Sequence, residues 1–347
     1  LSNYDGLDSV SVEFLRFHTM DPSDNVAERG AVLNNSHVYR MGLGYFGGVV
    51  YTRANAEYLR QNVSECYVTL SGRVETGVHA MLAAGRMAQD RAIAAAVNFV
   101  SKIGFHGIDL NVEGLAAFDP ADVPKYVAWL KRLGVALHKN GLKFRFTALA
   151  EGAYVSKPWS NDQLIPIMDH IDEIAPMGYD YMFDYGAVQV SPQDFVEASV
   201  EKLLQEGWPR EKIILGVANY GYVAKHSNPW SVRIIYTEEY NRLSQGYDVT
   251  AAGAEKYVDM GEEYMYFCGP ESMEEKRAYA QKMGLGGCVM WVAQNGGSWF
   301  STQSAQPAQS AQPAQPVARP GPIEILAQNG YTIGNLVDEL IQAFLHS

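Results

Sequence analysis

Cysteine and basic side chains are both scarce in this chain of 347 residues. The three cysteines, Cys66, Cys268 and Cys288, are an odd number without the spacing of metal ligands, so they predict neither a disulfide framework nor a zinc site. Lysine and arginine number 27 against 39 acidic residues, and the formal net charge of −12 argues against nucleic acid and anionic membranes as partners. No apolar run is long enough to predict a membrane-spanning helix. A neutral substrate remains compatible with this composition.

Aromatic side chains, by contrast, are plentiful, with 21 Tyr, 13 Phe and 6 Trp. Most of them are expected in the core, because 47% of the residues are hydrophobic and the length suits one large domain with a small appendage. The remaining aromatic side chains would suit stacking on sugar rings.

Apolar strand-like runs alternate with amphipathic helical stretches, which is typical of a parallel α/β fold. The predicted strands are 10–17, 38–46, 66–71, 107–112, 144–150, 173–179, 213–218 and 287–291. The predicted helices are 85–102, 120–140, 161–171, 191–206 and 272–283, and Ser191 with Pro192 fits the start of the fourth. Eight strands favour a TIM (β/α)8 barrel over residues 1–300. A doubly wound sheet is the alternative, although no Gly-rich phosphate loop follows the first strand.

Two further segments stand out along the chain. Residues 219–271 are rich in tyrosine and predict an extra hairpin or subdomain beside the cleft, although the segment looks too short for a full α+β insertion. Residues 301–322 repeat Ala, Gln and Pro, which predicts an extended linker.

The segment 323–347 predicts a C-terminal amphipathic helix. Its apolar face comprises Ile333, Leu336, Val337, Leu340, Ile341, Phe344 and Leu345. A single helix this short is not stable alone in water. We therefore expect the face at 333–345 to pack on the barrel, on a copy of itself, or on another protein.

Residues 104–114 are the most informative stretch of the chain. Asp109, Asn111 and Glu113 alternate with apolar residues, so they share one face of a strand that ends at Glu113. Polar groups directed into a strand-rich fold are costly unless they are used. A carboxyl at the carboxyl end of a barrel strand is a candidate general acid, which partial burial would keep protonated. By spacing alone, such a glutamate is more often solvated or paired.

This stretch resembles the signature Asp-x-x-Asp-x-Asp-x-Glu of family 18 glycoside hydrolases. His106 stands at the first Asp, Asp109 at the second, Asn111 at the third and Glu113 at the catalytic Glu. The first position mainly braces the strand, and we expect His106 to be a core histidine rather than a ligand. The resemblance implies a TIM barrel and, in Glu113, the general acid/base.

Other segments carry the same resemblance, from residue 38 to residue 291. Met177-Gly178-Tyr179-Asp180 resembles the motif of the sixth strand, where Tyr179 would bind the acetamido carbonyl and Asp180 the sugar. Residues 286–291 resemble the eighth strand, which implies that Trp291 is the floor of the sugar subsite. The expected substrate-binding residues are Asp180, Trp291, Tyr45, Phe46, Met177, Tyr181 and Tyr220. Two departures indicate a divergent groove: Arg73 replaces a glycine of the third-strand motif, and residues 216–221 lack the proline and the following arginine.

The family mechanism is substrate-assisted: the acid protonates the glycosidic oxygen while the substrate's own acetamido oxygen attacks the anomeric carbon, with net retention. The resemblance implies that Asn111 and Tyr179 position the acetamido group and that Asp109 supports Asn111. Asn111 replaces an aspartate that would offset positive charge, and the loss of one such partner typically costs about 10²–10³ in rate. Asn111 has three interpretations. It is the natural residue of an endo-β-N-acetylglucosaminidase-like enzyme, it marks a glycan-binding protein whose activity has decayed, or it is an introduced substitution.

The resulting hypothesis is retaining hydrolysis of β-1,4 linkages at N-acetylglucosamine (GlcNAc), in chitin, peptidoglycan or the core of an N-glycan, without a metal or cofactor. The alternatives are a weakened GlcNAc-binding lectin and a barrel that its C-terminal helix tethers to a larger assembly. We expect a secreted or extracellular protein.

Overall fold

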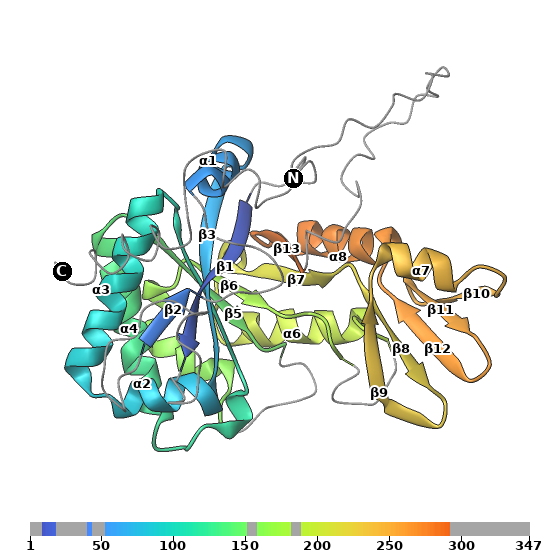
Figure 1. Ribbon diagram of the computed structural model, residues 1–347, viewed down its shortest axis with the longest axis horizontal. Helices are drawn as coiled ribbons and strands as arrows, with labels where there is room; N and C mark the ends of the chain where they lie inside the picture. Colours follow the sequence, from blue (N-terminus) through green and yellow to red (C-terminus); the bar gives the residue numbers. More distant parts are fainter. Residues whose placement is uncertain (1–8, 19–39, 44–52, 151–157, 182–188, 292–347) are drawn as a thin grey trace.

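Parallel strands that follow one another in chain order form the centre of the fold (Figure 1). The computed structural model describes residues 9–18, 40–43, 53–150, 158–181 and 189–291. The parallel strands are β1 (Ser9–His18), β3 (Glu65–Arg73), β4 (Gly107–Glu113), β5 (Lys143–Ala148), β6 (Glu173–Pro176), β7 (Ile214–Ala218) and β13 (Gly287–Trp291). A bridge between Ile174 and Ile213 links β6 to β7. The parallel α/β prediction is confirmed.

Helices cover the outside of these strands. They are α1 (Arg53–Asn62), α2 (His79–Ala83), α3 (Arg86–Ile103), α4 (Val123–Lys139), α6 (Gln193–Gln205) and α8 (Pro270–Met283). The other helical segments are the π-helix η2 (Val74–Val78) and the 3-10 helices η3 (Leu115–Ala117), η4 (Asn161–His170) and η5 (Arg210–Lys212). Helix α4 buries Tyr126, Trp129, Leu130, Leu133 and Leu137. This spacing of three and four residues is the apolar face from which the helix was predicted.

Two predicted elements differ in the structure. The segment 161–171 forms a 3-10 helix rather than an α-helix, since Pro166 inside it lacks the N–H that an α-helix needs. The segment 38–46 contains β2 (Arg40–Leu43), which pairs antiparallel with β1 instead of joining the parallel series. Gly42 lies within this short strand, and glycine weakens a strand interior.

The segment after β7 forms a subdomain beside the barrel strands, at the right of Figure 1. Its antiparallel sheet has the order β10-β11-β12-β8-β9. The elements are β8 (Gly221–Lys225), β9 (Asn228–Ile235), α7 (Thr237–Leu243), β10 (Val249–Ala252), β11 (Glu255–Asp259) and β12 (Glu263–Phe267). The prediction of a hairpin or subdomain is confirmed: five strands of four to eight residues and helix α7 fit into the segment.

The predicted linker at 301–322 and helix at 323–347 lie outside the described residues and stay predictions. No helix in the described ranges is long and apolar enough to cross a membrane.

Gly134 lies where α4 meets η4 most closely. A Cβ atom at this position would overlap the backbone oxygen of His170 and lie 2.9 Å from its Cβ. Glycine inside a helix normally costs about 1 kcal/mol relative to alanine. The close approach therefore explains a residue that helix propensity disfavours.

We expect Gly134→Ala to destabilise the protein by about 1–3 kcal/mol, because overpacking outweighs the gain in helix propensity. Urea unfolding measures the effect. Val135→Ala, at the neighbouring exposed position of the same helix, is the control and should change stability by less than about 0.5 kcal/mol. A more stable Gly134→Ala protein would contradict the close approach.

Candidate active site

The predicted polar row on β4 is present and runs from the interior to the rim. Asp109 is buried, Asn111 is half-buried, and Glu113 at the last position of the strand is exposed. The apolar residues between them are buried. The alternation therefore places these three polar side chains along one line, as predicted.

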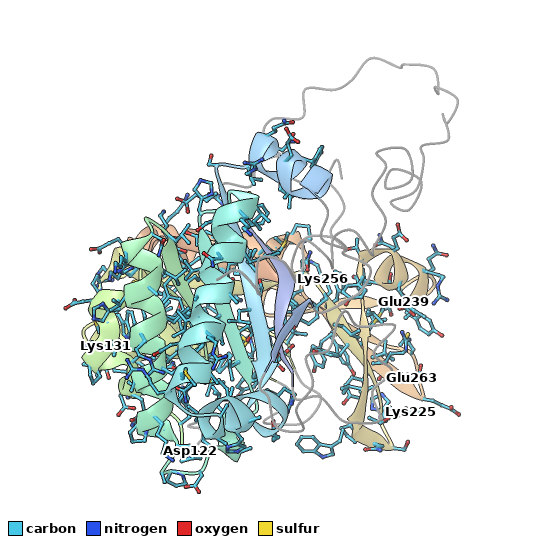
Figure 2. The ribbon with its side chains drawn as sticks, turned by 60° about the vertical axis from the view of Figure 1, so that its left-hand side comes forward. Asp122, Lys131, Lys225, Glu239, Lys256 and Glu263 are labelled. Atoms are coloured by element: carbon cyan, nitrogen blue, oxygen red, sulfur yellow. The ribbon has the colours of Figure 1, made fainter. Side chains whose placement is uncertain are left out.

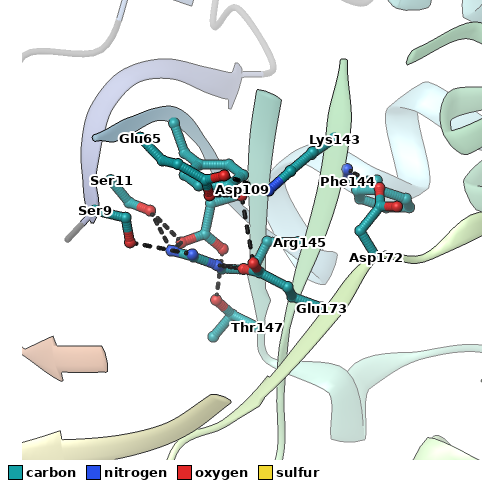
Figure 3. Close-up of polar contacts among 11 residues, drawn as sticks. Ser9, Ser11, Glu65, Asp109, Lys143, Phe144, Arg145, Thr147, Asp172 and Glu173 are labelled. Atoms are coloured by element: carbon teal, nitrogen blue, oxygen red, sulfur yellow. Dashed lines mark hydrogen bonds and ion pairs between the residues drawn. The ribbon is translucent and has the colours of Figure 1, made fainter. Parts of the chain in front are cut away.

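Arg145 on β5 lies at the inner end of this row (Figure 3). It is 3% exposed; its Nε donates to Glu173 Oε2 at 2.6 Å, and its Nη1 lies 3.9 Å from Asp109 Oδ2. The guanidinium also covers the Tyr67 ring, 4.1 Å from its centroid. Burial alone would lower the pKa of Arg145, but the charges of Asp109 and Glu173 act in the opposite direction, and the net shift of the pKa is upward. The interior thus holds a fixed cation with two carboxylates.

Asp109 receives hydrogen bonds from both sides. Ser11 Oγ donates to Oδ2 at 2.7 Å, and Thr147 Oγ1 donates to Oδ1 at 2.9 Å. Thr147 lies on β5, which pairs with β4. Ser11 lies on β1, which is distant in the sequence and pairs with β3. Among the described residues, no hydrogen bond joins Asp109 to Asn111. The predicted support of Asn111 by Asp109 therefore stays a prediction.

Asn111 carries an open acceptor. Its Oδ1 is buried and has no hydrogen-bond partner in the part of the chain that the structure describes. An unpaired buried acceptor costs about 1–3 kcal/mol. The oxygen is therefore placed to accept a hydrogen bond from a ligand N–H or O–H.

Glu113 is partly exposed. Its side chain is 52% exposed, and Arg73 Nη1 lies 3.4 Å from Oε2. β4 ends at this residue, so the carboxyl lies at the edge of the packed interior and about half of the side chain is covered. Arg73, which replaces a glycine of the family motif, also lies 3.5 Å from Glu75 and pairs with both carboxylates. Exposed pairs of this kind contribute at most about 1 kcal/mol, so Glu113 remains free to move.

Asp180 is held beside the row in a strained conformation. Its φ is 62°, in a region that few non-glycine residues adopt. Tyr220 Oη and Tyr222 Oη both donate to Asp180 Oδ1, at 2.6 and 2.7 Å. Burial raises the pKa of Asp180, and the charge of Glu113 raises it further. The two tyrosine hydrogen bonds lower it, but the net shift is upward. The tyrosines thus fix the carboxyl close enough to Glu113 for the two charges to interact.

Tyr179 joins Asp180 to the β4 row. Burial raises the pKa of Tyr179, and the charges of Asp180, Asp109 and Glu113 raise it further. Its hydroxyl therefore remains a neutral donor at physiological pH. Gly178 and Gly216 make the close approach of β6 to β7 possible, because a Cβ on Gly216 would lie 3.2 Å from Tyr179 Cε1 and one on Gly178 would lie 2.7 Å from the Gly216 oxygen.

A buried carboxylate ties the insertion to this loop. Glu255 on β11 is 1% exposed and accepts the backbone N–H groups of Val190 and Ser191, at 2.8 and 2.6 Å. Ser191 Oγ in turn donates to the Gly178 carbonyl at 2.5 Å. Ser191 is therefore not the predicted helix cap: its hydroxyl is used by the loop that carries Tyr179, and α6 begins at Gln193.

The other predicted residues lie in different places. Tyr220 is 1% exposed and acts through Asp180, whereas the Tyr181 ring packs on Phe195 of α6, with centroids 5.1 Å apart. Trp291 is 40% exposed at the end of β13, and Met177 is half-buried directly after β6. Tyr45 and Phe46 lie outside the described residues.

His106 is exposed, so the expectation of a core histidine is wrong. The ring Nδ1 of His106 accepts the Cys66 backbone N–H at 3.0 Å, and the backbone N–H of His106 donates to the Cys66 carbonyl at 2.7 Å. The predicted bracing role is confirmed, since these bonds join the start of β4 to β3. Because it precedes β4, the side chain lies outside the packed interior.

Tyr222 and Arg145 are the site residues that sequence reasoning missed. Tyr222 follows Tyr220 by two residues, so strand alternation could have placed both on one face. Arg145 alternates with Lys143 and Thr147 in the same way on β5. In the described ranges, no three His, Cys, Asp or Glu side chains are grouped so as to hold a metal ion. The site therefore offers a carboxyl at the rim, an amide oxygen and a phenol, which suits acid–base chemistry on a polar neutral substrate.

Comparison with known proteins agrees with this geometry. The family model described as glycosyl hydrolases family 18 matches residues 57–296. The chain belongs to glycoside hydrolase family 18. This family 18 protein is 25% identical over 239 residues to the "Probable endochitinase" of Caenorhabditis elegans, and 22% identical over 249 residues to "Probable chitinase 10" of Drosophila melanogaster. The matches cover 58% and 59% of the chain but only 38% and 11% of those relatives.

Solved structures show the fold of the family 18 protein. A chitinase from Chromobacterium violaceum has a TM-score of 0.66 and 19% identity, with 84% of this chain and 89% of that chain covered. A family 18 chitinase from Cycas revoluta in complex with (GlcNAc)3 has a TM-score of 0.63 and 16% identity, with 84% and 90% covered. These neighbours are TIM barrels, and the predicted fold class is confirmed.

The Arg145 pairs predict a stability effect. We expect Arg145→Met to lower the free energy of unfolding of the family 18 protein by about 3–5 kcal/mol, because buried Asp109 and half-buried Glu173 would both lose their cation. Denaturant unfolding measures it. Arg86→Met, which breaks an exposed pair with Asp90, is the control and should cost less than about 0.5 kcal/mol. Equal effects of the two changes would argue against the buried network.

Asp180 predicts a pH effect. Its native pKa is raised above 3.8, so the native state binds this proton more tightly than the unfolded state. The resulting stabilisation is complete below about pH 4 and is lost as pH rises through the raised native pKa. We expect the stability difference between the wild type and Asp180→Asn to fall with pH in this window and to be constant above it. Thermal unfolding of both proteins from pH 3 to 8 measures this, and a difference that rises with pH would contradict it.

Proposed function

We propose that this protein is a retaining glycoside hydrolase of the chitinase type that cleaves β-1,4 linkages at GlcNAc. The observation that carries the proposal is the row Asp109, Asn111 and Glu113 on β4, with Asn111 Oδ1 open and Tyr179 electrostatically coupled to the row. The relatives named as chitinases and the Cycas revoluta complex with (GlcNAc)3 support a GlcNAc-containing substrate.

In the proposed reaction, Glu113 gives its proton to the glycosidic oxygen as the bond from the anomeric carbon to that oxygen breaks. The acetamido oxygen of the same sugar forms the new bond to the anomeric carbon, which yields an oxazolinium ion. Asn111 Oδ1 accepts the acetamido N–H, and Tyr179 donates to the acetamido oxygen. Water then attacks the anomeric carbon and gives a proton back to Glu113, while the bond from that carbon to the acetamido oxygen breaks and restores the acetamide. Two inversions at that carbon produce net retention.

A lectin is the second candidate, and Asn111 is the observation that favours it. An amide orients the acetamido group but adds no negative charge beside the oxazolinium ion. The rate of hydrolysis is then lower by a factor of about 10²–10³ than it would be with a carboxylate. Binding without turnover would then be the remaining function of the same cleft.

Hydrolysis of a fluorogenic chitotrioside separates the candidates. We expect slow turnover by the chain itself, a loss of at least about 100-fold in Glu113→Gln, and a gain of about 10²–10³ in Asn111→Asp. Glu75→Gln is the matched control, because Glu75 also contacts Arg73 but does not lie on β4; its rate should be unchanged. Retained binding of GlcNAc oligosaccharides with no turnover in any variant would favour the lectin.

A further inference from the structure

Arg73 is a cation at the rim of the candidate active site, directly beside the residue proposed as the acid. In the parallel pairing of β3 with β4, Arg73 is the register partner of Glu113, as Ser71 is the partner of Asn111. Register partners on neighbouring strands point to the same face of a sheet, so Arg73 widens the polar row at its open end. Its side chain is 50% exposed. A ligand in the site can therefore reach the guanidinium.

The ion pairs of Arg73 leave much of its hydrogen-bonding capacity unused. Nη1 lies 3.4 Å from Glu113 Oε2, and Nε lies 3.5 Å from Glu75 Oε2. Charge-assisted N–H···O bonds are normally about 2.7–2.9 Å long, so neither contact holds the guanidinium tightly. Among the described residues, the guanidinium makes no further hydrogen bond or ion pair. Its planar fork of N–H donors is suited to a carboxylate that binds two of them together.

The proposed reaction removes one of these two partners. Glu113 begins the reaction as a neutral acid, because it gives its proton to the glycosidic oxygen. A neutral carboxyl no longer forms an ion pair with Arg73, whose charge is then opposed by Glu75 alone. The protein that is ready to react is therefore the form in which Arg73 is most available to an anion on the substrate.

Strand order indicates which sugar Arg73 faces. β3 lies on one side of β4, and β5 and β6 lie on the other. Tyr179 and Asp180 follow β6, so the sugar with the reacting acetamido group lies on that side of Glu113 in the proposed reaction. Arg73 lies on the opposite side of Glu113. It therefore faces the sugar beyond the glycosidic oxygen, which is the leaving group.

The segment that follows Arg73 lies away from the insertion. η2 begins at the next residue and leads into α2, where His79 Nδ1 lies 3.3 Å from Asp122 Oδ2. Figure 1 shows α2 at the lower left and the insertion at the right, and Figure 2 shows Asp122 to the left of Glu263 on the insertion. Arg73 thus belongs to a wall of the site that the segments after β3 and β4 form.

Two departures from the family motifs move a positive charge to this wall. Arg73 stands where the third-strand motif has a glycine, and Tyr222 stands where an arginine often follows the seventh-strand motif. Tyr222 donates to Asp180 without adding a charge. The cation therefore lies on the β3 side of Glu113 instead of the insertion side.

We propose that Arg73 is a specificity-determining residue that binds a carboxylate on the leaving-group sugar, so that the preferred substrate joins GlcNAc to an acidic sugar. The inference rests on the proposed function for the role of Glu113 and for GlcNAc at the cleaved bond. The net charge of −12 argues against a polyanion, but a single carboxylate needs only one local cation. A substrate carboxylate on Arg73 also takes the place that Glu113 leaves when it is protonated.

Calorimetry in the Glu113→Gln background measures binding without turnover, and the amide resembles the neutral acid. The ligand is a β-1,4 trisaccharide of two GlcNAc units and a reducing-end N-acetylmuramic acid, compared with the same trisaccharide whose lactyl carboxylate is amidated. We expect the acid to bind about fivefold to tenfold more tightly than the amide, and Arg73→Met to remove this preference. Arg73→Lys keeps the charge without the fork and should retain a preference of about twofold to threefold.

Arg277→Met is the matched control, because Arg277 is exposed on α8 and its loss changes the net charge equally. The Arg277→Met protein should keep the full preference for the acid. Equal affinity for the acid and the amide when Arg73 is present would overturn the proposal. A preference that survives Arg73→Met would overturn it as well.

A further ligand identifies the source of the carboxylate. The trisaccharide that ends in glucuronic acid carries the carboxylate on the sugar ring, whereas N-acetylmuramic acid carries it on a lactyl arm. Tighter binding of either acid, if lost in Arg73→Met, supports the proposal and assigns the acidic sugar. Binding of both acids no tighter than that of the amide would overturn it.

Turnover separates this inference from the proposed function. With Glu113 restored, we expect kcat/KM for release of the GlcNAc disaccharide to be at least about fivefold higher from the acid than from the amide, and Arg73→Met to abolish this ratio. Equal kcat/KM for the acid and the amide would overturn the specificity while the hydrolase stands. If neither ligand is hydrolysed but the Arg73-dependent binding preference persists, the hydrolase fails and the carboxylate site stands.

Discussion

The buried guanidinium of Arg145 is the interaction on which the interior of the barrel depends. Without this cation, buried Asp109 and half-buried Glu173 would lose their charge partner, and without the two carboxyl groups the buried guanidinium would be unpaired. Because Ser11 and Thr147 use both oxygens of Asp109, the carboxylate cannot rotate. The strand that carries Asn111 and Glu113 is therefore anchored below by charge, and its free end can be exposed without losing register.

A second constraint joins the barrel to the insertion. Asp180 comes from the loop after β6, but its hydrogen-bond donors Tyr220 and Tyr222 lie at the start of the insertion. Glu255 binds the same loop from β11 through Ser191. The insertion is thus fixed to the loop by two carboxyl groups, those of buried Glu255 and half-buried Asp180. A movement of its sheet would disturb both the strained φ of Asp180 and the position of Tyr179. The insertion sheet and Glu113 on β4 are consequently linked through the same loop and its neighbouring strands.

Local sequence patterns were sufficient to predict the features that depend on residue spacing within one helix or strand. The polar alternation on β4, the helical face of α4 and the parallel strand order all follow from residues close in sequence. The long-range partners could not be predicted, because Ser11 reaches Asp109 across 98 positions and Arg145 reaches Ser11 across 134. The same limit explains the errors at Ser191 and His106: both fit a local rule, but tertiary hydrogen bonds and the strand boundary decide their roles. Exposure of Glu113 likewise depends on where the surrounding strands end.

The neutral side chain at Asn111 has a consequence for the charge balance of the whole row. The charge of Glu113 already raises the pKa of Asp180, and three carboxylates raise that of Tyr179. A further carboxylate at position 111 would add to this repulsion, and Arg145 is already paired with Asp109 and Glu173. An amide avoids the repulsion and keeps the oxygen that a substrate N–H needs. In the proposed reaction, the cost falls on the positively charged oxazolinium ion, which then has no carboxylate at position 111 beside it.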